Sequence, residues 1–277
     1  MKPLPFKGVL LVSDMDGTLL NSSNRISDEN RKAIENFVEG GGLFTIATGR
    51  SSTILEKFLK ELPVNIPVIV INGAQIFDFK KKEVLFRWAL EKDIESTVRY
   101  LLDSYPSGLG MEIFSDAGVF VVRENEITEE HRSRECIMPG AFEIKDIPKP
   151  WYKVVLAWEN EKLKLIEAGL EGKMGTAHSA FSELRFLDIT HKNASKGIAL
   201  RELCNILGRS YSRVIAVGDN LNDLEMFKAA GIGIAVENAH EELKKHAAFC
   251  TNHHDQHAIA EIIRWIEEKS DEEVEDD

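Results

Sequence analysis

The segment Val9–Thr18 reads Val-Leu-Leu-Val-Ser-Asp-Met-Asp-Gly-Thr, an apolar run that ends on two aspartates, Asp14 and Asp16, and a glycine. A short, continuous apolar run predicts a buried parallel strand. In open α/β sheets the carboxyl ends of such strands face the ligand-binding crevice. One carboxylate there can attack an electrophile while its neighbour moves a proton, provided that a cation makes both charges tolerable. An acidic turn is the other interpretation, and this segment alone leaves both open.

The segments around this strand alternate between helix and strand. Ser27 is a candidate N-cap for a first helix, and an apolar strand over 43–47 follows it. A helix over 51–62 and a third strand over 68–71 come next. Later in the chain we expect helix 197–207, strand 214–217, helix 223–230, strand 232–236 and a final helix 257–269. This alternation predicts a doubly wound parallel sheet of the α/β class.

The middle of the chain has a different pattern, with short strands separated by turn residues. The expected strands are 75–79, 84–88, 111–114, 119–122, 151–158 and 184–190, and the expected helices are 93–102 and 161–170. This pattern predicts an inserted α+β domain. We therefore expect a core of residues 1–75 and 191–277, in which 267–277 is a frayed acidic tail, and an inserted cap domain of residues 76–190.

Composition restricts the kinds of partner. The chain has 34 lysines and arginines against 46 acids, a net charge of −12. Eight acids and one lysine in the last eleven residues account for −7, which leaves −5 for the body of the chain. The sequence has no basic stripe, and this disfavours nucleic-acid binding. We expect a small-molecule partner and no nucleic acid.

Cysteine spacing and the absence of long apolar runs predict the compartment. Cys136, Cys204 and Cys250 are odd in number and far apart, which argues against a disulfide framework and for a reducing compartment. No apolar stretch approaches the roughly 18 residues of a membrane span, and the N-terminal apolar run is too short for a signal sequence. We expect a cytoplasmic protein with no membrane partner, while the oligomeric state, monomer or dimer, stays open.

Polar clusters follow the carboxyl ends of the core strands. They are Asp14 and Asp16, Thr48-Gly49-Arg50, Asn72-Gly73 and Gly218-Asp219. In a doubly wound sheet these ends lie side by side, so the clusters share one crevice. The two strand-end aspartates and Asp219 make an all-oxygen site suited to Mg²⁺, which would clamp a phosphoryl oxygen. An ammonium group at Lys196 could neutralise a transferring phosphoryl group.

Four motifs together resemble those of the haloacid dehalogenase (HAD) superfamily, and more narrowly the Cof-type phosphatases with a type IIB cap. They are Asp14-Met15-Asp16-Gly17-Thr18-Leu19, Ala47-Thr48-Gly49-Arg50, Ser195-Lys196-Gly197 and Gly218-Asp219-Asn220-Leu221-Asn222-Asp223. The resemblance implies a HAD-like Rossmannoid core with an inserted α+β cap. It also implies a Mg²⁺-dependent phosphatase of small phosphorylated metabolites, with sugar phosphates as the expected substrates.

The resemblance also assigns roles to the motif residues. Asp14 would be the nucleophile that forms an aspartyl-phosphate, and Asp16 would protonate the leaving alcohol and then deprotonate the hydrolytic water. Lys196 would bridge the phosphate and Asp14. The phosphate-binding residues would be Thr48, Gly49, Lys196 and Asn222. The metal ligands would be Asp14, the backbone carbonyl of Asp16, and Asp219, with Asp223 in support.

The position of the insert predicts a lid. The segment between Thr18 and the first helix is too short for a domain, whereas 123 residues separate Asn72 from Lys196. A lid would exclude water and supply specificity for the leaving group. Candidate residues for this specificity are Glu112, Arg123, Arg185 and the tryptophans.

Other functions share parts of this pattern. A phosphomutase of the phosphomannomutase branch would use the same aspartate pair but return the phosphoryl group to the sugar. A receiver domain also places an aspartate near Mg²⁺, but it lacks the second aspartate and an insert of this size. A non-catalytic binding module would not need every motif residue. His253, His254 and His257 could bind zinc or nickel, although a solvated loop is the favoured interpretation.

Overall fold

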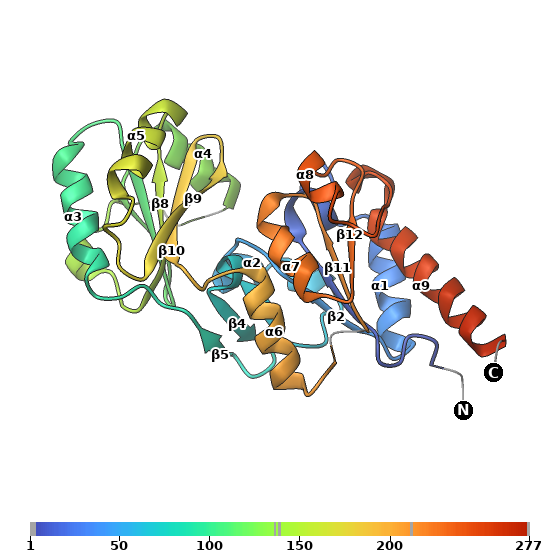
Figure 1. The fold of residues 1–277 in the computed structure, drawn as a ribbon. Coiled ribbons are helices and arrows are strands. Elements are labelled where there is room, and N and C mark those ends of the chain that lie inside the picture. The colour runs from blue at the N-terminus through green and yellow to red at the C-terminus, as the bar shows by residue number, and fades with distance from the viewer. Residues whose placement is uncertain (1–3, 136, 138–139, 211–212, 276–277) are drawn as a thin grey trace. The chain divides into compact units, whose positions relative to one another are not determined.

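The computed structural model describes residues 4–135, 137, 140–210 and 213–275, and the chain divides into two compact units (Figure 1). One unit, which we call the core unit, consists of Met1–Gly49, Glu56–Phe86 and Ser195–Asp277. The other, the inserted unit, consists of Arg50–Leu55 and Arg87–Ala194. The two-unit organisation agrees with an insert in the middle of the chain.

A five-stranded parallel sheet with the order β13-β12-β11-β1-β2 forms the centre of the core unit. Its strands are β1 (Leu10–Ser13), β2 (Leu43–Ile46), β11 (Val214–Gly218), β12 (Ile232–Ala235) and β13 (Phe249–Cys250). The central strand β1 pairs with β11 on one side and β2 on the other, so that Leu10 lies opposite Val214 and Leu43. All four residues of β1 are buried, which explains its uniformly apolar sequence. The predicted parallel sheet is confirmed.

Helices cover both faces of this sheet (Figure 1). On one face α1 (Asp28–Glu39) packs against α9 (Ala258–Glu275), and on the other α6 (Lys196–Leu207) packs against α7 (Leu224–Ala229). The short helix α8 (Glu241–Lys244) follows β12. The hydroxyl of Ser27 accepts a hydrogen bond from the Asn30 amide, as predicted for an N-cap. Helix α9 extends beyond its predicted end to Glu275, and residues 276–277 of the acidic tail lie outside the described residues.

The boundary of the insert differs from the predicted one. Strands β3 (Val68–Val70), β4 (Gln75–Asp78) and β5 (Glu83–Arg87) form a separate three-stranded sheet. Strand β3 is antiparallel to β4, and Ile69 also forms a parallel bridge with Ala47, directly after β2. Residues 76–86 therefore belong to the core unit rather than to the insert, because their hairpin pairs with a core strand.

The inserted unit is an α+β structure with an antiparallel sheet in the order β7-β6-β8-β10-β9. Its strands are β6 (Gly110–Ser115), β7 (Gly118–Arg123), β8 (Trp151–Ala157), β9 (Ala177–Glu183) and β10 (Phe186–His191). Its helices are α2 (Ser52–Leu55), α3 (Ile94–Ser104), α4 (Glu126–Glu135) and α5 (Asn160–Leu170). Apolar side chains of α3 and α5, such as Val98 and Leu163, form one buried cluster with the sheet. The predicted α+β class of the insert is confirmed.

One predicted helix is much shorter than expected. The segment 51–62 forms only the single turn α2 and a separate 3₁₀ turn, Leu59–Glu61. The two turns fall in different units, because residues 50–55 group with the inserted unit and residues 56–86 with the core unit. The predicted helix over 51–62 is thus wrong in its length, and the division between the two units falls inside this segment.

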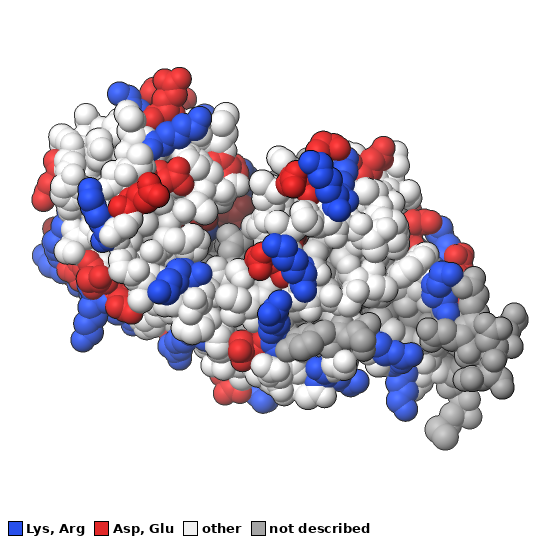
Figure 2. All heavy atoms as spheres, in the orientation of Figure 1, with Lys and Arg blue, Asp and Glu red and all other residues white. Residues whose placement is uncertain are grey.

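Charged side chains of both signs are interspersed over the face drawn in Figure 2. Several charged side chains of the described residues form close ion pairs, such as Arg31 with Asp28 at 2.8 Å and Lys228 with Glu225 at 2.8 Å. Exposed pairs of this kind contribute little to stability. Among the described residues, no helix is long and apolar enough to cross a membrane.

Two of the three cysteines lie in the described residues, and both are free thiols. Cys204 is buried on α6, and burial raises the pKa of its thiol to about 11. It is therefore protonated at neutral pH and acts as a small apolar core residue. Cys250 is exposed, and Cys136 lies outside the described residues.

Candidate active site

Asp14 lies at the carboxyl end of β1, at the centre of the parallel sheet. Its amide donates a hydrogen bond to the carbonyl of Val217 on the neighbouring strand β11, at 2.8 Å, so the residue extends the strand pairing by one position. The side chain is buried, whereas that of Asp16 is exposed. Two carboxylates two residues apart thus have different surroundings, which is what different chemical roles require.

Lys196 is the first residue of α6 and is almost completely buried, with 1% of its surface exposed. The Ser195 hydroxyl caps this helix by accepting a hydrogen bond from the Ile198 amide at 3.1 Å. The Lys196 ammonium donates to Oδ1 of Asp14 and to Oδ1 of Asp223, both at 2.6 Å. The structure therefore brings together three residues that are far apart in the sequence, as the sequence predicts.

Asp223 has no exposed surface and holds its loop together. Its Oδ2 accepts hydrogen bonds from the backbone amides of Asp219 at 3.0 Å and Asn220 at 3.2 Å, while Oδ1 accepts from Lys196. Both oxygens are thus engaged with the protein itself. This pattern fits a supporting role, in which Asp223 positions Lys196 and the loop that carries Asp219.

Asp219 completes a group of three carboxyl groups. The Thr18 hydroxyl donates to its Oδ1 at 2.9 Å. Asp14, Asp219 and Asp223 each offer one carboxylate oxygen, and these oxygens all lie within 4.8 Å of one another. An all-oxygen set at this spacing suits a hard divalent cation such as Mg²⁺. The residues present thus fit the predicted metal.

Two glycines allow the close approach of these loops. Gly73 has φ +93°, and a Cβ there would lie 2.1 Å from the carbonyl oxygen of Ser195. Gly17 has φ +78°, and a Cβ there would lie 2.6 Å from Oδ2 of Asp219. A larger residue at either position would clash and would need a strained backbone. These glycines let the backbone pass directly beside the charged group.

The electrostatics of the group are unbalanced. Burial raises the pKa of Asp14 well above its usual value, and the charges of Asp223 and Asp219 raise it further, while Lys196 partly offsets both. Burial also raises the pKa of Asp219, together with the charge of Asp223. Burial alone would lower the pKa of Lys196. The charges and hydrogen bonds of Asp14 and Asp223 raise this pKa by more, so the ammonium stays charged. Three carboxyl groups share one ammonium, so full ionisation requires another cation.

The predicted phosphate-binding residues also converge. Thr48, the second residue after β2, is buried, and its carbonyl accepts a hydrogen bond from the Asn72 amide at 2.9 Å. The Asn222 side chain donates to Oδ1 of Asn72 at 3.2 Å. A Cβ on Gly49 would lie 3.1 Å from that same oxygen. Asn72 therefore lies between Gly49 and Asn222, a position to which the sequence motifs assign no role.

Asn238 is a second residue without a predicted role. Its Nδ2 donates to the carbonyl of Gly17 at 2.8 Å, and its Oδ1 accepts from the His254 amide at 3.0 Å. It thus holds the loop that follows the nucleophile. Because Asn238 lies shortly after β12, the same strand-end argument that selects Asp219 could have found it.

The candidate specificity residues of the insert make contacts within their own unit. Glu112 is completely buried and lies 2.8 Å from Nδ1 of His131. Arg123 donates to the carbonyls of Leu102 and Tyr105 at the end of α3, and Arg185 pairs with Glu130 at 3.0 Å. Three of the four tryptophans lie in the inserted unit. Trp151 belongs to its buried hydrophobic cluster, Trp88 stacks on His191, and Trp158 contacts Tyr105. The fourth, Trp265, lies in the core unit and contacts Phe249. Arg50 of the second motif pairs with buried Glu135 at 3.0 Å.

Comparison with known proteins identifies the class. Residues 11–263 match the family of haloacid dehalogenase-like hydrolases. A 5-amino-6-(5-phospho-D-ribitylamino)uracil phosphatase from Bacillus subtilis (strain 168) is 31% identical, over 90% of this chain and 95% of its own length. An HMP-PP phosphatase from Escherichia coli O6:H1 is 27% identical, over 85% of this chain and 86% of its own. The chain therefore belongs to the haloacid dehalogenase-like hydrolases.

Solved structures agree with this assignment. A haloacid dehalogenase-like hydrolase from Bacteroides thetaiotaomicron has a TM-score of 0.87 at 27% identity, over 94% of this chain and 99% of its own. A sugar phosphatase of HAD subclass IIB shares the fold, with a TM-score of 0.79 at 21% identity, over 93% of this chain and 98% of its own. The protein is thus an enzyme of the hydrolase class, and the resemblance to the Cof-type phosphatases is confirmed.

Proposed function

We propose that this hydrolase is a Mg²⁺-dependent phosphatase that cleaves small phosphorylated metabolites through an aspartyl-phosphate on Asp14. One observation carries the proposal: a buried ammonium, Lys196, lies 2.6 Å from Asp14 beside two further carboxyl groups. The excess of carboxylates calls for a divalent cation, and the ammonium can neutralise charge on a transferring phosphoryl group. Asp14 and Asp219 would hold the Mg²⁺, with the backbone carbonyl of Asp16, and Asp223 would support them.

The chemistry divides into two steps. In the first, a carboxylate oxygen of Asp14 attacks phosphorus, the bond from phosphorus to the ester oxygen breaks, and Asp16 gives its proton to the departing alkoxide. In the second, Asp16 takes a proton from a water molecule that attacks the aspartyl-phosphate, and inorganic phosphate leaves. A bound Mg²⁺ would lower the pKa of Asp14 and polarise the phosphoryl oxygens. Thr48, the Gly49 amide and Asn222 would bind those oxygens.

Sugar phosphates are the substrate class that we propose within this function. The relatives are named as phosphatases of small phosphorylated compounds, including a phosphoribityl-aminouracil and HMP-PP. We assign the choice of ester to the inserted unit, because the residues that bind phosphate and metal all belong to the core unit. A phosphate-release assay on a panel of phosphorylated metabolites, with Mg²⁺ and with EDTA, tests the proposal.

The expected result is Mg²⁺-dependent release of inorganic phosphate, with the free alcohol as the second product. Conversion of a hexose phosphate to its isomer without release of phosphate would instead identify a phosphomutase. Full activity in EDTA would show that no metal is needed and would contradict the proposal.

A further inference from the structure

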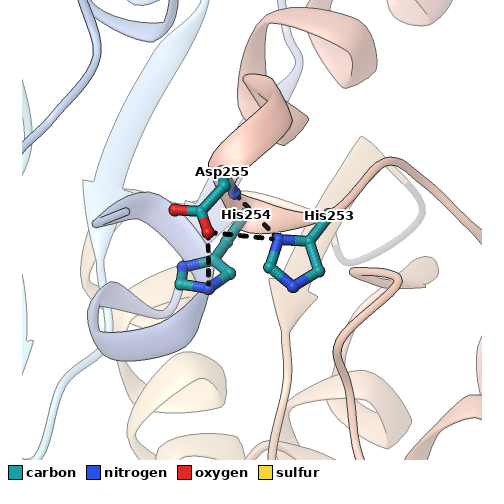
Figure 3. A group of neighbouring side chains, drawn as sticks. All are labelled: His253, His254 and Asp255. Carbon is teal, nitrogen blue, oxygen red and sulfur yellow. Dashed lines mark hydrogen bonds and ion pairs between the residues drawn. The ribbon is translucent and has the colours of Figure 1, made fainter. Parts of the chain in front are cut away.

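A second group of potential metal ligands lies in the loop that leads into α9 (Figure 3), and it shares no residue with the carboxylates already described. Nδ1 of His253 lies 3.6 Å from Oδ2 of Asp255, and Nε2 of His254 lies 3.9 Å from the same oxygen. Figure 3 shows both ring nitrogens directed toward this one carboxylate. The sequence alone favours a solvated loop here, but the structure adds an arrangement that sequence spacing could not show.

The hydrogen bond of His254 fixes which ring nitrogen is available. Its Nδ1 lies 2.7 Å from the carbonyl oxygen of Leu20, and a carbonyl can only accept, so Nδ1 carries the hydrogen. In the neutral ring Nε2 then has a free lone pair on the side of Asp255. Histidine ligands of metals usually donate their other ring N–H to a carbonyl in this way, because the bond fixes the ring and its tautomer.

Hydrogen bonds from Ser22 fix the orientation of the Asp255 carboxylate. The amide of Ser22 donates to its Oδ1 at 2.7 Å, and the hydroxyl of Ser22 donates to its Oδ2 at 2.6 Å. These hydrogen bonds lower the pKa of Asp255. The carboxylate is therefore ionised at neutral pH, and each oxygen retains a lone pair for a further partner.

We propose that His253, His254 and Asp255 bind a divalent transition-metal ion of the Zn²⁺ type. In a tetrahedral site with ligand bonds of about 2.0–2.2 Å, the ligand atoms lie about 3.4 Å apart. The observed separations of 3.6 and 3.9 Å require only a small closure. His253 would exchange its 3.2 Å contact with the Asp255 amide for the metal. Imidazole nitrogens favour Zn²⁺ over Mg²⁺, so the two metal sites differ in selectivity.

The site would tie two segments of the core unit together. Leu20 and Ser22 belong to the segment that follows the nucleophile, and His254 also reaches Gly17 through Asn238. A metal ion on this loop would therefore stabilise the chain beside Asp14 without contacting it. This inference does not depend on the proposed phosphatase function.

Titration of the intact protein with Co²⁺ in saturating Mg²⁺ tests the proposal. Mg²⁺ occupies the carboxylate site, and tetrahedral Co²⁺ bound by histidine gives much stronger visible absorption than octahedral Co²⁺ bound by oxygen. We expect strong bands that saturate at one ion per chain and disappear on addition of Zn²⁺. Asp255→Asn and His253→Ala should lose the bands, while the control His246→Ala, an exposed histidine outside the group, should keep them.

Thermal unfolding gives an independent measurement. His253→Ala leaves the bond between His254 and Leu20 intact, so this variant is expected to fold. Zn²⁺ should raise the unfolding temperature of the intact protein and of His246→Ala by about 2 °C or more, and should not raise that of His253→Ala. The proposal is wrong if the intact protein shows no strong bands, or if His253→Ala and Asp255→Asn keep both the bands and the Zn²⁺ effect.

Discussion

The two units each contain a buried lysine bound to a carboxylate, but the balance of charge differs. In the core unit Lys196 contacts Asp14 and Asp223 at 2.6 Å, and Asp219 lies in the same group. In the inserted unit Lys153 pairs with Asp188 at 3.3 Å, and its ammonium also lies 4.3 Å from the centre of the Phe114 ring. Within the described residues, the group in the core unit has three carboxyl groups and one ammonium. The group in the inserted unit has one carboxyl group and one ammonium.

This difference separates a binding site from a structural ion pair. A balanced buried pair needs no further ion, and its main effect is that either partner alone would be costly to bury. The core group cannot ionise fully without another cation, because burial and then the charges of the neighbouring carboxylates raise the pKa values of Asp14 and Asp219. Burial together with an excess of carboxyl groups over ammonium groups therefore marks the position where chemistry is expected.

Removal of the nucleophile should have the largest effect. Asp14→Asn keeps the size of the side chain but loses the attacking charge, so kcat should fall by about 10³-fold or more. The control is Asp188→Asn, which neutralises the carboxylate of the other pair and should retain kcat within about threefold. Initial rates of phosphate release measure both. Near-normal turnover by Asp14→Asn would exclude the aspartyl-phosphate mechanism.

Loss of a metal ligand should have the next largest effect. Asp219→Ala removes one of the two carboxylates that we assign to Mg²⁺, so the apparent Kd for Mg²⁺ should rise by about 10- to 100-fold. The measurement is the Mg²⁺ concentration for half-maximal activity after treatment with EDTA. Equal values for the variant and the natural protein would remove Asp219 from the metal site.

Loss of the carboxylate in the inserted unit should lower stability and leave metal binding unchanged. Asp188→Asn leaves Lys153 buried without its counter-charge, so the free energy of unfolding should fall by about 2–3 kcal/mol. Chemical denaturation, followed by a probe in each unit, measures this change. The apparent Kd for Mg²⁺ should stay unchanged, and a shift of that Kd would show that the comparison between the two groups fails.

The smallest expected effect is a gain in stability, in contrast to the loss expected for Asp188→Asn. The folded-state pKa of Asp219 is raised, so its ionisation costs stability as the pH rises from its unfolded pKa through its folded pKa. Without metal at neutral pH, Asp219→Asn should therefore be more stable by about 1 kcal/mol. Mg²⁺ should reverse the order, because the natural protein binds the ion more tightly and so gains more stabilisation from it. Denaturant titrations with EDTA and with Mg²⁺ measure both signs.

Strand ends are the most informative part of the sequence. Because parallel strands of one sheet end at the same edge, the sequence predicts that Asp14, Asp219 and Asn222 lie near one another. The role of Lys196 is predicted from the motif resemblance, because nothing in its own sequence context distinguishes it from a surface lysine. The close approach of Gly73 to the backbone of Ser195 and Lys196 exists only in the folded chain.

Elements with weak local signals escape prediction from the sequence. Helix α4 reads Glu-Ile-Thr-Glu-Glu-His-Arg-Ser-Arg-Glu and has no apolar stripe, so its position depends on packing against β6. Strand β9 consists mostly of small and polar residues, and its pairing with β10 defines it. The β4–β5 hairpin resembles the insert in its pattern, and its partner, β3, cannot be identified from the hairpin itself.

Calorimetric titration of the metal-free protein with Mg²⁺ tests most directly whether the unbalanced carboxylates form a cation site. Since the pKa values of Asp14 and Asp219 are raised without metal, Mg²⁺ binding competes with the protonation of these groups. We predict that binding releases protons and that the apparent affinity falls as the pH is lowered, with Asp188→Asn behaving like the natural protein. No binding of Mg²⁺, or an affinity independent of pH with no proton release, would contradict the account.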